Sequence, residues 1–144
     1  MKFIGKNLLL SVVAAGLMAF TGSALAEVAV IANPSSSIAS ASNDEIKRLF
    51  LGKSKDVAGN SATPVDQAGD STAKDQFYQV VVGKNSSQLR AYWAKLVFTG
   101  KGKPPKELGT DADVIAAVAA DASLVGYVDV SAVTGDVKVI LLVR

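Results

Sequence analysis

The sequence predicts a single α/β domain in which helices flank a mixed β-sheet. Two observations predict this class. Short apolar, β-branched runs alternate with longer segments whose apolar residues recur every three or four positions. The 144-residue chain leaves 118 residues once its first 26 are set apart, which is enough for one core. The expected order is strand, helix, strand, three helices and two strands, and this alternation favours helices packed on a sheet.

The first strand and helix are expected near the start of the domain. Residues 28–32 are an apolar run that stops before an Asn-Pro pair, which is typical of a buried strand. Residues 34–42 are rich in Ser and Ala and predict a loop. Ser42 and Glu45 have capping-box spacing in front of an apolar helix face. Gly52 is placed to end that helix in the left-handed conformation.

The middle of the chain predicts a weak strand and two helices. Residues 53–62 are polar and contain glycines, so a loop is expected there. Residues 63–65 form the weak strand, and the helical pattern that follows ends near Gly83. Ser86 or Ser87 is expected to cap the next helix. The residues expected to face inward from this helix are Leu89, Trp93, Leu96 and Val97.

The last third predicts an irregular connection, one helix and two strands. Residues 99–109 hold three glycines and two prolines, so no regular element is expected there. Thr110 is expected to cap a helix whose first turn carries two aspartates, which suit the helix dipole. Strands are expected at residues 124–128 and 137–143. The second is nearly all apolar, which predicts a strand that is central or covered on both faces.

Residues 1–26 have the three parts of a cleavable secretory signal peptide. Lys2 and Lys6 charge its beginning, an apolar run of about 13 residues follows, and Ala24-Leu25-Ala26 offers small residues to a signal peptidase. The run is shorter than the roughly 20 residues that span a bilayer. We therefore expect cleavage before Glu27 and a domain at residues 27–144. Because the chain has no Cys for lipid attachment, the expected product is periplasmic, without a lipid anchor and not membrane-bound.

Composition argues against several classes of function. The two signal lysines account for the net positive charge, so the remaining domain has 13 basic and 13 acidic residues. This neutrality predicts neither a nucleic-acid surface nor an anionic-membrane patch. The chain has no Cys and no His, which removes the thiol nucleophile, the commonest general base and the commonest metal ligand. No enzyme activity, metal or cofactor is expected.

The main candidate ligand site is the turn that precedes the helix after residue 70. A strand leads into a turn at Gly69, and Ser71 and Thr72 then open the helix. The first turn of a helix exposes unpaired N–H groups and a partial positive charge, so it can hold an oxyanion. Asp70 or Ser71 can equally be an ordinary N-cap. The residues leave both interpretations open.

A second candidate is the loop after the first strand, where Ser35, Ser36 and Ser37 follow Pro34. A serine-rich loop at the end of a strand can supply hydroxyl groups to a ligand. A flexible polar loop has the same composition, so this segment also remains open. Four lysines outside these segments are expected to be exposed: Lys74, Lys101, Lys103 and Lys106.

Several segments resemble the phosphate-binding proteins of ABC transporters, a type 2 periplasmic-binding family. The pattern I-x-x-[IL]-F-x-G at residues 46–52 and the G-Y-V strand at residues 126–128 are typical of that family. The resemblance spans about residues 28–130 and is greatest to the short, single-domain members. The other segments that carry it are Thr63-Pro64-Val65-Asp66, Phe77-Tyr78, Tyr92-Trp93, Phe98-Thr99-Gly100-Lys101-Gly102 and Pro104-Pro105.

The resemblance implies a single periplasmic-binding-protein-like lobe that binds phosphate or a similar oxyanion for an ABC-type uptake system. It implies that Gly69, Ser71 and Thr72 correspond to the family's hydroxyl-bearing turn at a helix N-terminus. It also implies that Ser35 to Ser37 take the part of the loop in the first lobe. The transporter's membrane subunits are the expected protein partners.

The sequence departs from the family pattern in three ways. The family's arginine has no counterpart, because its neighbourhood holds Asp66 and Gln67. Asp70 places a negative charge beside the proposed anion, which would weaken binding. A full member has two lobes around the anion, so a second copy of this chain is expected to complete the site, which predicts a homodimer. The alternative is a non-catalytic adaptor module that has kept the fold and lost its ligand.

Overall fold

A five-stranded sheet forms the centre of the computed structural model, which describes residues 27–144. The predicted signal peptide, residues 1–26, lies outside the described residues. The strand order is β5-β4-β6-β1-β7; β4 is parallel to β5 and to β6, and β1 is antiparallel to β6 and to β7. The sheet is therefore mixed, as predicted. The strands are β1 (Val28–Ala32), β4 (Thr63–Gln67), β5 (Lys106–Leu108), β6 (Leu124–Asp129) and β7 (Lys138–Val143).

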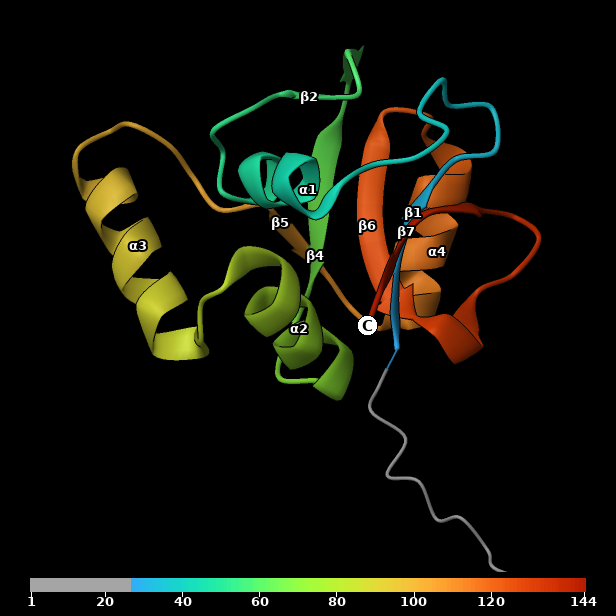
Figure 1. Cartoon of the computed structure of the whole chain (residues 1–144). Helices are drawn as coiled ribbons and strands as arrows, with labels where there is room; N and C mark the ends of the chain where they lie inside the picture. The colour runs from blue at the N-terminus through green and yellow to red at the C-terminus, as the bar shows by residue number, and fades with distance from the viewer. Residues whose placement is uncertain (1–26) are drawn as a thin grey trace, which may run out of the picture.

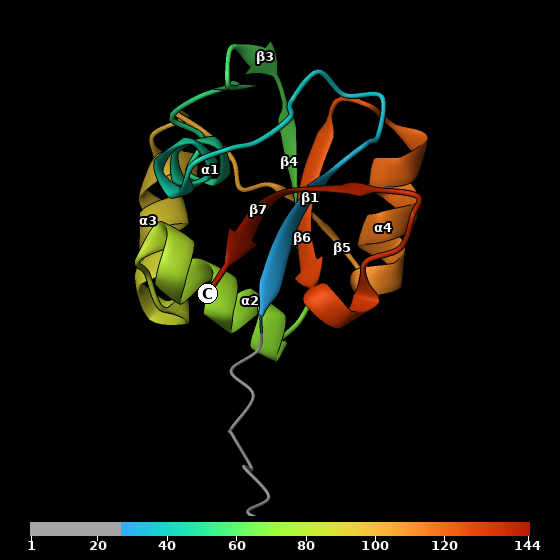
Figure 2. The same cartoon turned by 45° about the vertical axis from the view of Figure 1, so that its right-hand side comes forward.

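Helices cover both faces of the sheet, and Figures 1 and 2 show α4 on one side with α1 and α2 on the other. The helices are α1 (Asn43–Phe50), α2 (Thr72–Phe77), α3 (Ser86–Phe98) and α4 (Asp111–Ala120). A π-helical turn, η1 (Tyr78–Val82), continues α2, and a short 3-10 turn, η2 (Val130–Ala132), follows β6. Among residues 27–144, no helix has the length and apolar character needed to cross a membrane.

The central strand β1 is buried on both faces, which confirms the predicted buried strand. Successive side chains of a strand point to opposite faces. Val28, Val30 and Ala32 belong to the apolar cluster under α1 and α2, whereas Ala29 and Ile31 belong to the cluster under α4. The strand therefore joins the two halves of the core.

The predicted helix ends are largely confirmed. Ser42 and Glu45 form a capping box at the start of α1, and Gly52 follows that helix with φ 72°. Thr110 caps α4. The prediction for α3 was wrong by one residue, because Asn85 is the cap: its side chain accepts from the Gln88 N–H, and Gln88 bonds back to the Asn85 backbone.

Three short strands lie where the sequence predicts irregular structure. β2 (Asp56–Val57) and β3 (Asn60–Ser61) form a hairpin, and the N–H of Ala58 in its turn donates to the Glu45 carboxylate at 2.6 Å. β5 lies within the predicted connection at residues 99–109 and pairs with β4. β5 depends on a partner that is distant in the sequence, whereas β2 and β3 pair locally with each other.

The prediction for the last strand was wrong. β7 is an edge strand that pairs only with β1, and Val139 and Leu142 are 42% and 39% exposed. Two side chains of β7, Ile140 and Val143, pack into the apolar core. The strand is therefore not covered on both faces. The inward face predicted for α3 is also smaller than expected, because Val97 is 54% exposed.

Candidate functional site

Two helices begin at the edge of the sheet where the parallel strands end. β4 ends at Gln67, and its neighbours β5 and β6 end beside it because all three run in the same direction. The first turns of α2 and α4 lie at this edge, which in open α/β sheets is the usual place for a ligand. A hollow of about 380 Å³ lies there and is lined by Gln67, Ala68, Asp70 to Ala73, Gly109 to Asp111 and Asp129.

Ser71 is the N-cap of α2. Its hydroxyl oxygen accepts from the Lys74 N–H at 3.0 Å and donates to Gln67 Oε1 at 3.1 Å. The exposed Thr72 follows, and within residues 27–144 the backbone N–H groups of Thr72 and Ala73 have no hydrogen-bond acceptor. The N-cap and the oxyanion interpretations are therefore compatible, because capping uses the Ser71 hydroxyl and leaves two N–H groups free.

Gln67 connects the parts of this edge. Its side chain is 3% exposed, and its amide nitrogen donates to the Tyr127 carbonyl at 2.9 Å and to the Asp111 carboxylate at 2.6 Å. Because its amide oxygen accepts from Ser71, Gln67 links β6, the first residue of α4 and the cap of α2. Gly69, with φ 74°, turns the chain between β4 and α2.

The hollow is acidic. Asp70, Asp111 and Asp129 line it, and no lysine or arginine does. Asp129 caps the turn η2, and hydrogen bonds from the Ser131 hydroxyl and N–H lower the pKa of its carboxyl. Among the described residues, no group of three acidic side chains is arranged to hold a metal ion. An anion in this hollow would meet free N–H groups and repulsive carboxylates together.

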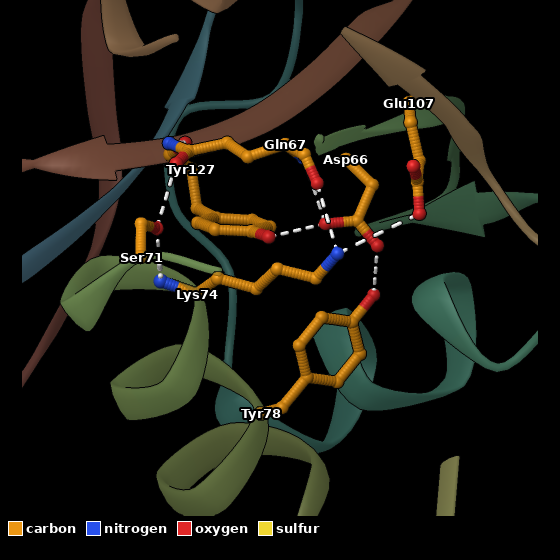
Figure 3. A network of polar contacts seen from close by, with 7 residues as sticks. All are labelled: Asp66, Gln67, Ser71, Lys74, Tyr78, Glu107 and Tyr127. Carbon is orange, nitrogen blue, oxygen red and sulfur yellow. Dashed lines mark hydrogen bonds and ion pairs between the residues drawn. The ribbon is translucent and has the colours of Figure 1, made fainter. Parts of the chain in front are cut away.

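Asp66 does not line the hollow, and Figure 3 shows its carboxylate in contact with the hydroxyl groups of Tyr78 and Tyr127. Its side chain is 5% exposed, and one carboxylate oxygen accepts from the Gln67 N–H at 2.8 Å. The hydroxyl groups of Tyr78 and Tyr127 donate to the two carboxylate oxygens. Asp66 lies in the segment where the resemblance implies an arginine, but its charge is satisfied inside the protein and it does not line the hollow.

Lys74 is not the exposed residue that the sequence predicts. Its side chain is 18% exposed, its ammonium group donates to the Gln67 carbonyl at 2.9 Å, and it lies 3.6 Å from the Glu107 carboxylate (Figure 3). The difference arises because β5 brings Glu107 beside α2, and no local pattern predicts that strand. Lys101, Lys103 and Lys106 are exposed, as predicted.

A second cleft, of about 440 Å³, lies between α2 with its π-helical turn and the first part of α3. Lys74, Lys84 and Arg90 line it together with three acidic residues, so its charges are mixed. The acidic residues are Asp70, Asp75 and Glu107, and the main apolar ones are Leu89, Trp93 and Pro104. No local motif marks this cleft, since its residues come from four separate segments.

The serines after β1 lie at the other end of the sheet. Because β1 runs antiparallel to β6, its carboxyl end faces away from the start of α2, about 17 Å along a five-residue strand (Figure 1). Ser35 donates to Asn33 at 2.6 Å, and the Ser36 hydroxyl accepts from Ile38 N–H. The structure does not bring Ser35, Ser36 and Ser37 together with Ser71 and Thr72.

Comparison with solved structures finds the same fold in phosphate-binding proteins. An ABC-type phosphate transport receptor of Vibrio cholerae matches with a TM-score of 0.61 at 13% identity, over 81% of this chain and 46% of the receptor. A phosphate ABC transporter substrate-binding protein of Clostridium perfringens, solved with bound phosphate, matches with a TM-score of 0.60 at 15% identity, over 81% of this chain and 45% of that one. Over most of its length, this chain therefore shares the fold of one part of each of these proteins.

The chain spans somewhat less than half the length of these neighbours. No family model matches the sequence, and no curated protein matches it by sequence. At these identities the likeness shows the fold alone. The fold class that the sequence predicts, a periplasmic-binding-protein-like lobe with a mixed sheet, is thereby confirmed, and the neighbours are binding proteins rather than enzymes.

Proposed function

We propose that residues 27–144 form an exported, non-catalytic solute-binding domain that binds phosphate or a similar oxyanion for an ABC-type uptake system. The observation that supports this most is the pair of free N–H groups on Thr72 and Ala73, beside the Ser71 and Thr72 hydroxyls, in a hollow of a fold shared with a phosphate-bound protein. Amide and hydroxyl donors at a helix start suit an oxyanion. Cleavage before Glu27 and a periplasmic location are part of the proposal.

The acidic lining limits the affinity that one copy can reach. A carboxylate about 4 Å from an anion costs about 1 kcal/mol in water and about 4 kcal/mol near a protein surface. Asp70, Asp111 and Asp129 all line the hollow, so their repulsion offsets much of what two N–H groups and the free Thr72 hydroxyl contribute. Tight binding therefore requires cationic groups from a second body, either another copy of this chain or the transporter.

Calorimetric titration of the secreted protein with phosphate tests this proposal. Thr72→Ala removes an exposed hydroxyl without touching the Ser71 cap, and should weaken binding about tenfold. Asp70→Asn removes an exposed carboxylate and should strengthen binding about fivefold. Ser37→Ala, an exposed serine at the opposite end of the sheet, is the matched control and should change nothing.

The same acidic lining favours a second candidate function, a periplasmic adaptor that has kept the fold and lost its ligand. The two functions give opposite results in the titration. The binding proposal would be contradicted if millimolar phosphate produced no heat and no thermal shift, both with the wild type and with Asp70→Asn. In that case Thr72→Ala should also leave the function of the protein in cells unchanged.

A further inference from the structure

The segment from residue 84 to residue 106, here named the basic arm, carries six basic side chains and no acidic one. The secreted domain as a whole has 13 basic and 13 acidic residues, so the neutral total conceals a strong separation of charge. The rest of the domain is correspondingly acidic. The basic residues are Lys84, Arg90, Lys95, Lys101, Lys103 and Lys106.

The basic arm lies at one side of the molecule. Figures 1 and 2 place α3 at the margin, on the side opposite α4. Trp93 is the only buried residue among the 13 of α3. Within residues 27–144, none of the six cations of the basic arm forms an ion pair. Their positive charge is therefore not neutralised by the protein itself.

The free charge is concentrated at the carboxyl end of α3. Lys84 and Arg90 face the second cleft, whose lining also includes carboxylates. Lys95, Lys101 and Lys103 are exposed and have no such neighbours among the lining residues. The N–H of Lys101 donates to the Leu96 carbonyl at 2.9 Å, which folds the chain back and holds Lys101 beside the helix end.

Two exposed apolar side chains lie in the same short stretch of chain as these lysines. Phe98 is 92% exposed and Val97 is 54% exposed, the largest exposures among the large hydrophobic residues described. Lys95 and Phe98 are three residues apart in the helix and so share a face. Lysines near a helix carboxyl end suit its dipole, but the dipole gives no reason for a phenylalanine in water. An exposed aromatic residue among cations is instead typical of an interfacial contact.

We propose that the basic arm docks on an anionic lipid bilayer, with Phe98 and Val97 in the interface and Lys95, Lys101 and Lys103 against the headgroups. A bilayer accepts a small apolar projection of any shape. A protein partner normally needs about 800 Å² per side around an apolar core, and this tip offers only two apolar residues. The lysines supply the charge complementarity that an anionic surface requires.

Vesicle co-sedimentation tests the proposal, using the exported protein after mass spectrometry has shown that its N-terminus is Glu27. Phosphatidylcholine vesicles with and without phosphatidylglycerol are compared at low and at physiological salt. Binding should require phosphatidylglycerol and weaken with salt. Each lysine near the surface strengthens binding about fivefold, so Lys101→Gln with Lys103→Gln should weaken it about 25-fold.

The control pair is Lys53→Gln with Lys55→Gln, two exposed lysines with the same spacing outside the basic arm. It should leave vesicle binding nearly unchanged, whereas Phe98→Ser should weaken it without lowering the melting temperature. Equal weakening by the two lysine pairs would overturn the proposal. No binding to phosphatidylglycerol vesicles at low salt would also overturn it and would leave an acidic protein as the partner of the basic arm.

Discussion

Asp66 is a buried carboxylate whose charge is satisfied entirely by neighbouring groups of the protein. Burying a carboxylate costs several kcal/mol unless hydrogen bonds satisfy it. Here the Gln67 N–H and the hydroxyls of Tyr78 and Tyr127 supply three donors. Since these donors come from β4, η1 and β6, the buried charge joins three elements directly behind the ligand edge.

The two tyrosines predict how stability depends on pH. Burial, and then the Asp66 carboxylate, raise the pKa of both Tyr78 and Tyr127 far above the usual value near 10. Above about pH 10 the unfolded chain loses both phenolic protons while the folded protein keeps them, so the folded state binds more protons and stability falls as pH rises. The free energy of unfolding should fall by about 2.7 kcal/mol per pH unit from these two groups.

Urea denaturation between pH 9 and pH 12, with Tyr78→Phe compared against wild type, measures this effect. The variant removes one of the two groups, so the part of the slope due to Tyr78 and Tyr127 should halve. Tyr92→Phe is the control: partial burial also raises the pKa of Tyr92, but its hydroxyl donates to the Leu51 carbonyl and not to a carboxylate, so this variant should reduce the slope less than Tyr78→Phe does. A Tyr78→Phe slope equal to that of wild type would contradict the assignment.

The elements of the fold differ in how far the sequence could predict them. Capping boxes and apolar periodicity are local signals, and they located β1, α1, α4 and β6 within a residue or two. β5 has no such signal, because Lys106-Glu107-Leu108 becomes a strand only by pairing with β4. The edge position of β7 depends on sheet order, which no local pattern encodes. The neighbours of Asp66 lie 12 and 61 residues away, so its burial could not be predicted either.

Gly126 allows α4 to pack closely on β6. A Cβ atom at this position would lie 2.6 Å from Val114 Cγ1 and 3.1 Å from Val65 Cγ2. Gly126→Ala should therefore overpack the core and lower the free energy of unfolding by about 1–3 kcal/mol. Gly135→Ala is the matched control, because its Cβ would meet nothing within 4 Å. Thermal unfolding of the two variants checks the prediction, and equal melting temperatures would refute it.

At the scale of the whole molecule, the acidic hollow at the sheet edge and the basic arm at the margin of the fold divide the charge of a neutral domain. The composition predicts the neutral net charge of the domain. It does not predict the separation of acidic and basic surfaces, because that separation depends on which segments meet at each surface. Turn chemistry could single out Ser71 and Thr72 as candidates at the start of α2. It could not predict the acidic lining around them, since Asp111 and Asp129 reach the hollow from two other elements.

The acidic hollow predicts an oligomer whose formation depends on the proposed ligand. The chain spans less than half of its solved neighbours, and its proposed site lacks a cation among the lining residues. If a second copy supplies the missing groups, phosphate is linked to association, and adding it should convert monomer to dimer. Sedimentation velocity with and without phosphate should show this shift, sodium chloride at equal ionic strength should not, and Thr72→Ala should reduce it. The affinity for phosphate should also rise with protein concentration. If instead a monomer binds phosphate saturably, with an affinity that does not depend on protein concentration, one copy forms the whole site and the prediction is wrong.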